Sequence, residues 1–500
     1  MRALLVTSVG VTCAAALTLP LAAPALSAPA PLSASARPPS LSPESPGSGP
    51  PSSARAETAS SRAAELAGST QSLPLEPLAA PSDRVAGAAA GQGLAQRDAR
   101  PFSLVGVVWD DAEAELHGTV QVRTRATGGE SWSGWQDVET HNAEHAADLG
   151  SAERASGAVR GATAPLWVGD SDGVEVRVRP EAADPQHRAA AAALPEGLRL
   201  ELVDPGADPE PDPADAEAAA TDAVPAGRAA PVGRSATPAT FAVNPAPPTT
   251  TVVPEVLTAE AEAASAVNAE LAPLGASVIP ALTKAETEEA ANVAAGAKPY
   301  IGPRPKIVTR KGWGADEKLR ERQFAYTKTV KAAFVHHSAT GNNYTCKQAP
   351  SVLRSIYRYH VKSSGWRDFG YNFAVDKCGN IYEGRAGGVT KAVLGAHTLG
   401  FNTNTMGIAV LGSYSSTNPP AAAVTAVSKL TAWKLGLFGA NPKGKVTLTS
   451  GGSNKYKAGV KVKMNVISGH RDGFATECPG ARLYKKLGTA RTSSAKLQGR

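Results

Sequence analysis

The chain of 500 residues is long enough for about three domains. Its composition, with 48 glycines, 39 prolines and only 5% aromatic residues, excludes a single compact core of that size. The formal net charge of +6 is unevenly distributed, because residues 301–500 carry a balance of +24 and residues 1–300 a balance of −18. A segment this basic attracts polyanions such as nucleic acid, anionic lipid or acidic wall polymers. A polytopic membrane protein is also excluded, since a single apolar run, at the N-terminus, approaches the length of a membrane span.

The N-terminal segment has the pattern of an export signal. Arg2 supplies positive charge, residues 3–23 are apolar, and Ala34-Ser35-Ala36 offers a cleavage site, with residues 25–28 as an earlier alternative. Two prolines at the end of the apolar run favour cleavage over a retained anchor helix. We therefore expect residues 1–36 to be a signal peptide and the mature chain to be secreted. No integral membrane span would remain after cleavage, and an exported chain is not expected to bind nucleic acid.

The number of cysteines agrees with export. Cys13 would leave with the signal peptide, so three of the four cysteines remain. An odd number outside the cell requires a free thiol or a metal ligand.

Residues 37–205 divide into two segments of different character. Residues 37–100 are rich in Ala, Ser, Pro and Gly and lack aromatic residues, so we expect them to be disordered. Residues 101–205 contain short alternating runs bounded by turn residues, which predict a small antiparallel β domain. The expected strands are 102–109, 118–125, 132–138, 164–168, 173–179 and 197–203. Four tryptophans are interpreted as core residues, with a sugar-binding face as the alternative: Trp109, Trp132, Trp135 and Trp167.

Residues 206–300 are predicted to be a linker. A Pro/Ala/Asp-rich stretch comes first, and residues 255–295 have a helical composition interrupted by Pro273 and Pro280. This pattern indicates a loosely helical spacer. The remaining segment, 301–490, is expected to be one domain.

The C-terminal domain shows clear strand and helix patterns. Residues 332–338 (AAFVHHS) form an apolar strand that ends in two histidines, and adjacent side chains on a strand point to opposite faces. Only one of His336 and His337 can therefore face a given metal. The remaining patterns predict a helix at 350–361, a hairpin at 371–383, a strand at 405–411 and a helix at 421–438.

A candidate metal site combines the histidine pair with the segment 470–480 (HRDGFATECPG). Catalytic zinc takes three protein ligands and leaves a fourth position for water. One histidine of the strand, together with His470 and Cys478, would supply two nitrogens and one sulfur. Spacing alone leaves this site open, because histidine pairs and lone cysteines are common.

Six short motifs occur in a fixed order along this domain. They are VHHS (335–338), GYNF (370–373), YEGR (382–385), GAH (395–397), NTMGIAVLG (404–412) and GHRD…TECPG (469–480). The set resembles the peptidoglycan recognition protein/type-2 N-acetylmuramoyl-L-alanine amidase family over residues 306–487. The resemblance implies an α/β fold, with a mixed central sheet flanked by helices, and a zinc hydrolase. Its substrate would be the lactyl amide between N-acetylmuramic acid and L-Ala of bacterial peptidoglycan. The 101–205 domain also resembles one found upstream in exported actinobacterial members.

The resemblance implies a Zn²⁺ cofactor and a role for each matched residue. The implied ligands are His336, His470 and Cys478, and the thiol matters because members with serine at the last position bind muropeptide without cleaving it. The implied catalytic residues are Tyr371, for which a core tyrosine is the alternative, and Thr476, which would face the bound water. The implied substrate contacts are His397, Asn402 and Arg385. His337 and His360 are interpreted as supporting or core residues.

One departure concerns specificity. After the YEGR motif, members that prefer diaminopimelate stem peptides often have Gly-Trp, whereas this chain has Ala386-Gly387-Gly388-Val389. The sequence therefore gives no prediction of which third stem residue is preferred.

Two alternatives to an amidase remain. One is a non-catalytic module that recognises peptidoglycan without cleaving it. The other is a basic adhesion protein that contacts anionic wall polymers such as teichoic acid through its charge. In each case we expect a monomer.

The two cysteines that are not assigned to zinc are expected to form a disulfide. Cys346 precedes the predicted 350–361 helix, and Cys378 lies in the turn of the predicted hairpin, 32 residues further on. An exported chain favours the disulfide over two free thiols. The remaining alternative, that either cysteine joins the zinc, falls outside the His/His/Cys pattern.

Overall fold

The computed structural model describes residues 68–78, 91–140, 142–182, 193–209, 257–291 and 300–500. All of them belong to one compact unit, residues 55–500. The predicted signal peptide and most of the predicted linker lie outside the described residues. Within the described ranges, no helix is both long enough and apolar enough to cross a bilayer.

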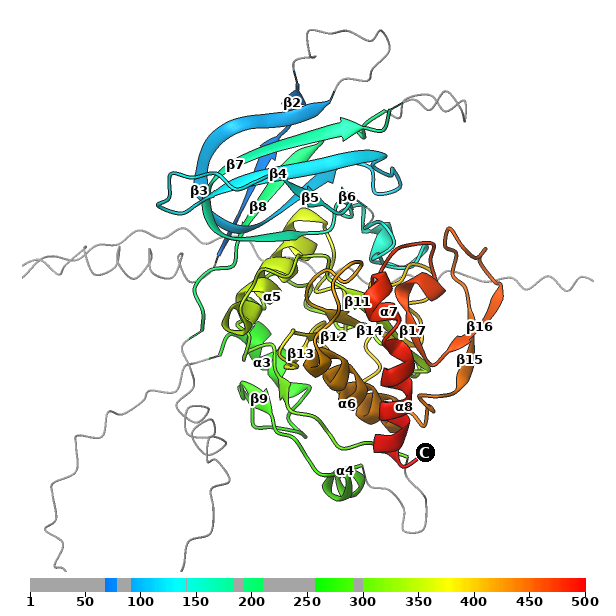
Figure 1. Ribbon diagram of the computed structural model, residues 1–500. Coiled ribbons are helices and arrows are strands. Elements are labelled where there is room, and N and C mark those ends of the chain that lie inside the picture. The colour runs from blue at the N-terminus through cyan, green and yellow to red at the C-terminus, as the bar shows by residue number, and fades with distance from the viewer. Residues whose placement is uncertain (1–67, 79–90, 141, 183–192, 210–256, 292–299) are drawn as a thin grey trace, which may run out of the picture. The chain divides into compact units, whose positions relative to one another are not determined.

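The N-terminal domain is an antiparallel β domain, as predicted (Figure 1). Its sheet has the order β1-β8-β3-β7-β4-β5, and β2 and β6 pair with β3. The strands are β1 (Ser69–Pro74), β2 (Glu76–Pro77), β3 (Gln92–Trp109), β4 (Gly118–Ala126), β5 (Gln136–Val138), β6 (Gly161–Ala162), β7 (Leu166–Pro180) and β8 (Arg199–Asp204). Alternating valines of β4 and β7 point into the core, because side chains two residues apart share one face.

This domain begins earlier than predicted. The expectation of disorder up to residue 100 is wrong for residues 68–78 and 91–100, which form β1, β2 and the first half of β3. β1 pairs with β8 from Ser69↔Asp204 to Pro74↔Arg199. Its sequence, STQSLP, has one large apolar residue, so backbone pairing rather than apolar burial fixes the strand. Amino-acid composition does not indicate such backbone pairing between strands.

The tryptophans of the β domain fall into two groups. Trp109 and Trp167 are buried core residues, as predicted. Trp132 and Trp135 are half-buried instead, and arginine guanidinium groups lie over their rings. Arg177 Cζ is 3.9 Å from the centroid of the Trp135 ring.

The C-terminal domain contains a seven-stranded mixed sheet in the order β17-β11-β14-β12-β13-β10-β9. From the β17 edge, the strands β17, β11, β14 and β12 run parallel, as do β13 and β10, whereas β12/β13 and β10/β9 are antiparallel pairs. The strands of this domain are β9 (Val278–Ile279), β10 (Ile307–Val308), β11 (Ala332–His337), β12 (Phe373–Val375), β13 (Ile381–Glu383), β14 (Thr405–Val410), β15 (Lys445–Thr449), β16 (Lys461–Asn465) and β17 (Ile467–Gly469). The separate β15–β16 hairpin was not predicted.

Helices cover both faces of this sheet. The helices of this domain are α3 (Ala259–Ala266), α4 (Lys284–Ala290), α5 (Ala349–Arg358), α6 (Ala421–Leu437), α7 (Ala481–Tyr484) and α8 (Leu487–Gln498). α6 and α8 lie side by side (Figure 1) and pack on the face that carries Val335 and Ile408. α5 packs in a second cluster with Ala374 and Ala409. That cluster continues into the β domain through Leu104, Val108, Trp167 and Val203.

Two boundaries of the C-terminal domain differ from prediction. Residues 257–291 were expected to be a loose spacer, but they are part of this domain. Ile279 of β9 is fully buried and pairs with Ile307 of β10, and Asn268 Nδ2 donates to Glu383 Oε1 at 2.8 Å. At the other end, α8 continues past residue 490 to Gln498, whose side-chain amide donates to Ala432 O.

Candidate metal centre

The candidate centre starts at the end of β11. His336 is fully buried, and its register partner on the neighbouring strand β14 is Ala409. Its Nε2 lies 3.4 Å from Thr398 Oγ1, which leaves Nδ1 to face the centre. His337 points to the other face, as predicted from strand alternation, and its Nδ1 accepts a hydrogen bond from Tyr414 N.

β17 brings the second histidine to the same sheet edge. It runs parallel to β11, with Val335 opposite Gly469, so the residues that follow both strands meet at one edge. His470 begins a 3₁₀ turn, His470–Asp472, directly after Gly469. Asp472 fixes this turn by accepting hydrogen bonds from Gly469 N at 2.9 Å and from the Tyr484 hydroxyl at 2.6 Å.

The loop after His470 returns Cys478 to the first histidine. Arg471 N donates to Cys478 O at 3.0 Å, which closes the loop, and Cys478 N donates to Thr476 Oγ1 at 3.1 Å. Cys478 Sγ lies 3.8 Å from His336 Nδ1. The structure therefore brings together the three ligands predicted from the sequence.

A fourth side chain, which the sequence analysis missed, lies in the same cluster. His145 of the β domain is buried, and its Nε2 is 3.1 Å from His470 Nδ1. One donor atom from each of His145, His336, His470 and Cys478 lies within 4.8 Å of the others. A local signal was present, since the segment His141-Asn142-Ala143-Glu144-His145 places two histidines four residues apart beside an acid.

The donor set fits a zinc ion. Ligand atoms of a tetrahedral site, at the usual zinc–nitrogen and zinc–sulfur distances, stand about 3.3–3.6 Å apart. The two separations of 3.1 Å and 3.8 Å bracket that value. Zinc binds imidazole nitrogen and cysteine sulfur in preference to oxygen ligands alone, so three imidazoles and one thiol suit it.

Protonation also suits a metal site. Burial, and then the neighbouring histidines, lower the pKa of His336 and His470 well below the ordinary value, so both imidazoles are neutral. Burial lowers the pKa of His145 to about 3. Neutral imidazole is the form that binds metals. Burial raises the pKa of the Cys478 thiol, and a divalent cation would favour its thiolate instead.

Tyr371 lies beside the cluster. Its ring centroid is 5.2 Å from that of His336 and 5.9 Å from that of His145. Burial and the nearby Cys478 and Glu144 raise the pKa of its hydroxyl, which therefore stays protonated as a hydrogen-bond donor. The same group lines a small cavity with Glu144, Thr476 and Cys478.

The other predicted site residues have hydrogen-bond partners inside the chain. Thr476 Oγ1 donates to Glu144 Oε1 at 2.7 Å, and Arg385 forms a two-pronged ion pair with Glu153. Asn402 accepts from His397 N at 2.7 Å. The His397 ring lies 5.4 Å from the His336 ring, centroid to centroid, with its Nδ1 3.0 Å from Thr398 Oγ1.

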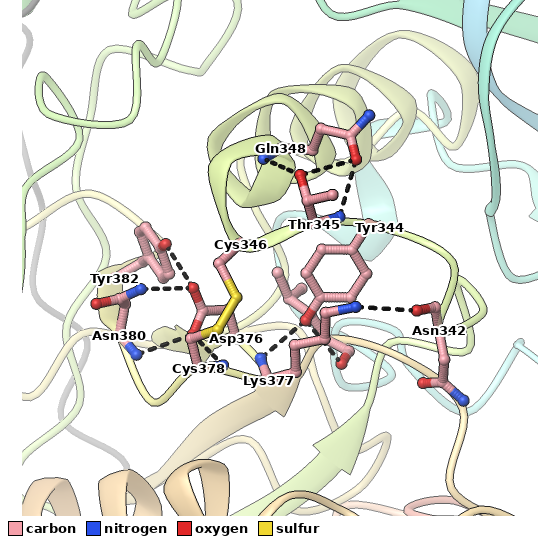
Figure 2. The surroundings of a disulfide bond; sticks show 11 residues. Asn342, Tyr344, Thr345, Cys346, Gln348, Asp376, Lys377, Cys378, Asn380 and Tyr382 are labelled. Carbon is pink, nitrogen blue, oxygen red and sulfur yellow. Dashed lines mark hydrogen bonds between the residues drawn. A yellow bond between two sulfur atoms is a disulfide. The ribbon is translucent and has the colours of Figure 1, made fainter.

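Cys346 and Cys378 form the predicted disulfide (Figure 2), with their Cα atoms 6.2 Å apart. It joins the start of the α5 region to the β12–β13 turn. Asp376 organises that turn by accepting hydrogen bonds from Cys378 N and Asn380 N. Among the described residues, Cys478 is the free cysteine.

Comparisons with known proteins divide the chain in the same way. One family model, Rv3811 N-terminal galactose-binding domain-like, matches residues 56–196. A second, N-acetylmuramoyl-L-alanine amidase, matches residues 326–481.

Individual relatives match the C-terminal domain. Peptidoglycan-recognition protein SC2 of Drosophila simulans is 31% identical over 185 residues, which cover 37% of this chain and 85% of that protein. The N-acetylmuramoyl-L-alanine amidase of Homo sapiens is 31% identical over 211 residues, covering 40% of this chain and 32% of that protein. The solved structure of Drosophila PGRP-LB is similar at 25% identity and a TM-score of 0.29, covering 37% of this chain and 92% of that one.

Proposed function

The chain belongs to the family of peptidoglycan-recognition proteins and type-2 N-acetylmuramoyl-L-alanine amidases, and we propose that it is a zinc-dependent amidase of bacterial peptidoglycan. The bond cleaved would be the lactyl amide between N-acetylmuramic acid and L-Ala. The observation that carries the proposal is the convergence of His336, His470 and Cys478 on one point. The thiol is decisive, because a serine hydroxyl would be a poor zinc ligand at this position.

The proposed division of labour follows from the geometry. His336, His470 and Cys478 would hold the ion, which when bound supplies Lewis-acid chemistry and activates water at neutral pH. Thr398 orients the His336 ring, since its hydroxyl lies 3.4 Å from the ring nitrogen that faces away from Cys478. The protonated Tyr371 hydroxyl would donate to the amide oxygen as negative charge develops there.

We also propose that the chain acts outside the cell, on the wall. Six exposed lysines gather on and around the β15–β16 hairpin: Lys443, Lys445, Lys455, Lys457, Lys461 and Lys463. Such a surface attracts anionic wall polymers. Export through residues 1–36 and a monomeric state remain part of the proposal.

The test is product analysis with the full chain. Insoluble peptidoglycan is incubated with zinc-loaded protein, and the soluble products are examined by mass spectrometry. Free amino termini on L-Ala, lost when Cys478 is replaced by Ser, are the expected result. Binding to peptidoglycan without new L-Ala termini, in the full chain and in the variants described below, would support the non-catalytic alternative instead.

That alternative has one observation in its favour. Glu144 and Glu153 of the β domain occupy hydrogen-bonding groups of Thr476 and Arg385, on which an amidase of this family would depend. If these contacts were permanent, the centre would not cleave peptidoglycan, and wall fragments would bind at another surface of the chain.

A further inference from the structure

We propose that residues 142–153 of the β domain, called here the docking segment, keep the amidase latent by closing its metal centre. In the closed state His145 is a fourth zinc ligand, and the segment must leave before substrate can bind. The inference rests on the proposed amidase function and concerns its regulation.

The first argument is the number of ligands. A catalytic zinc site has three protein ligands and an open position, whereas a closed site has four. His145 brings the number of converging donor atoms to four, all within 4.8 Å of one another. Its ring centroid lies 4.4 Å from that of His470 and 5.3 Å from that of His336, so it enters the cluster directly.

The second argument is that the neighbours of His145 also bind residues around the metal centre. The Glu144 carboxylate accepts from Thr476 Oγ1 at 2.7 Å, and its carbonyl accepts from Leu399 N at 2.9 Å. Asp148 Oδ1 accepts from Gly400 N at 2.8 Å and from Asn402 Nδ2 at 2.7 Å. Donors of the C-terminal domain, at Thr476 and in the segment that follows Thr398, are thus already paired with acceptors of the docking segment.

The third argument is charge. The docking segment contains three acidic residues, Glu144, Asp148 and Glu153, and no lysine or arginine, whereas residues 301–500 carry a balance of +24. Glu153 completes the set by pairing both carboxylate oxygens with Arg385. The segment is therefore complementary to the basic domain on which it lies.

These contacts are of the kind that a peptidoglycan fragment would make. Its stem peptide carries carboxylates and its amides carry carbonyl oxygens, which are the acceptors that the docking segment presents. Segment and substrate would then compete for the same donors. The segment has the advantage, because a tethered ligand acts at an effective concentration of about millimolar.

Two variants of the full chain test the closed state. His145→Ala removes the fourth ligand, and His117→Ala is the matched control, since that side chain is 54% exposed on the same domain. Each protein is loaded with Co²⁺, and its visible absorption spectrum is recorded while azide is added. We expect azide to change the spectrum of His145→Ala and to leave the wild type and His117→Ala unchanged.

A further variant moves the docking segment without changing any of the four candidate zinc ligands. Glu153→Lys places a cation against Arg385 and should displace the docking segment while all four candidate ligands remain. Circular dichroism confirms that each variant is folded. If His145→Ala does not fold, Glu153→Lys gives the same azide test.

Hydrolysis of a small soluble muropeptide supplies the second readout. His145→Ala and Glu153→Lys are the two opening variants. If the closed state accounts for 90–99% of wild-type molecules, both should cleave about 10- to 100-fold faster than the wild type. His117→Ala should match the wild type.

The outcomes separate the two proposals. An azide response in the wild type equal to that of His145→Ala would overturn latency, whatever the amidase rate. An azide response confined to the opening variants, with no free L-Ala termini from any of them, would support closure and refute the amidase proposal.

Discussion

Arg385 and Glu153 form a buried ion pair between the two domains. Arg385 Nη1 lies 2.8 Å from Glu153 Oε2 and Nη2 lies 3.0 Å from Oε1, and the two side chains are 6% and 8% exposed. Burial alone would raise the pKa of Glu153, but the arginine outweighs it and the pKa is lowered. The carboxylate therefore stays charged at neutral pH.

Replacing Glu153 by Gln should loosen the docking segment. Breaking a buried pair by removing one charge costs about 3–5 kcal/mol, because the other charge is left uncompensated. Detachment of the segment would let water reach Arg385, so we expect faster amide hydrogen exchange in residues 142–153 rather than global unfolding. Asp98→Asn is the control, since Asp98 is 85% exposed in its pair with Arg125 and such pairs contribute at most about 1 kcal/mol. Equal exchange rates in wild type and Glu153→Gln would contradict this.

Replacing Cys478 by Ser should preserve the fold and weaken metal binding. The hydroxyl has nearly the same volume as the thiol, but it does not ionise at neutral pH and so cannot replace a thiolate ligand. Zinc content by elemental analysis should fall, and release of L-Ala termini should stop. Full zinc content with unchanged hydrolysis would refute the ligand assignment.

Wall binding should depend on salt more than hydrolysis does. At physiological ionic strength the screening length is about 8 Å, so added salt weakens attraction between exposed lysines and a polyanion. Sedimentation with intact walls should therefore fall as NaCl rises, and further in a Lys461→Glu/Lys463→Glu variant, whose two side chains are exposed. Cleavage of a small muropeptide should change little. Equal salt sensitivity of the two assays would argue against wall docking by this surface.

Removing the Cys346–Cys378 disulfide should destabilise the C-terminal domain. The bond closes a loop with a sequence separation of 32 residues. In the chain-entropy model such a loop contributes about 3.5–4 kcal/mol. Urea unfolding of a Cys346→Ser/Cys378→Ser variant measures the loss. Protein without residues 1–36 should show one reactive thiol when denatured and three after reduction, and three before reduction would exclude the bond.

Glu383 should make stability fall as pH rises. Its carboxyl is buried, and burial raises its pKa to about 7 from an ordinary 4.5. Between those values the folded chain holds a proton that the unfolded chain has lost, so the free energy of unfolding decreases with pH. The shift corresponds to about 3 kcal/mol. Unfolding measured from pH 4.5 to 8 should show a smaller decrease in Glu383→Gln than in wild type, and parallel curves would contradict the assignment.

Local sequence patterns predicted the elements that carry the candidate site. Apolar runs at 332–338 and 405–411 became β11 and β14, because buried parallel strands need continuous apolar residues. The motif order then indicated His336, His470 and Cys478. Features that depend on pairing between distant segments were missed. β1 is held by a backbone ladder, and the spacer was recognisable as part of the domain only through its contact with β10.

His145 shows the same limit in the site itself. It lies 325 residues from His470 along the chain, and nothing local requires the two to meet. Its buried position depends on how the β domain packs against α5, through contacts that no single segment encodes.

Tyr359, at the end of α5, makes the folding of each domain depend on the other. Its hydroxyl donates to Thr163 O at 3.1 Å, and a Cβ added at Gly106 would lie 2.4 Å from its oxygen. Gly106 on β3 thus leaves the space that this tyrosine side chain fills, although the two residues are more than two hundred positions apart in the sequence. A fragment of residues 300–500 alone would expose this tyrosine and its apolar neighbours to solvent. It would also lack residues 257–291. A fragment cut at the sequence motifs would be a different molecule, prone to aggregate, and its activity would say little about the intact chain.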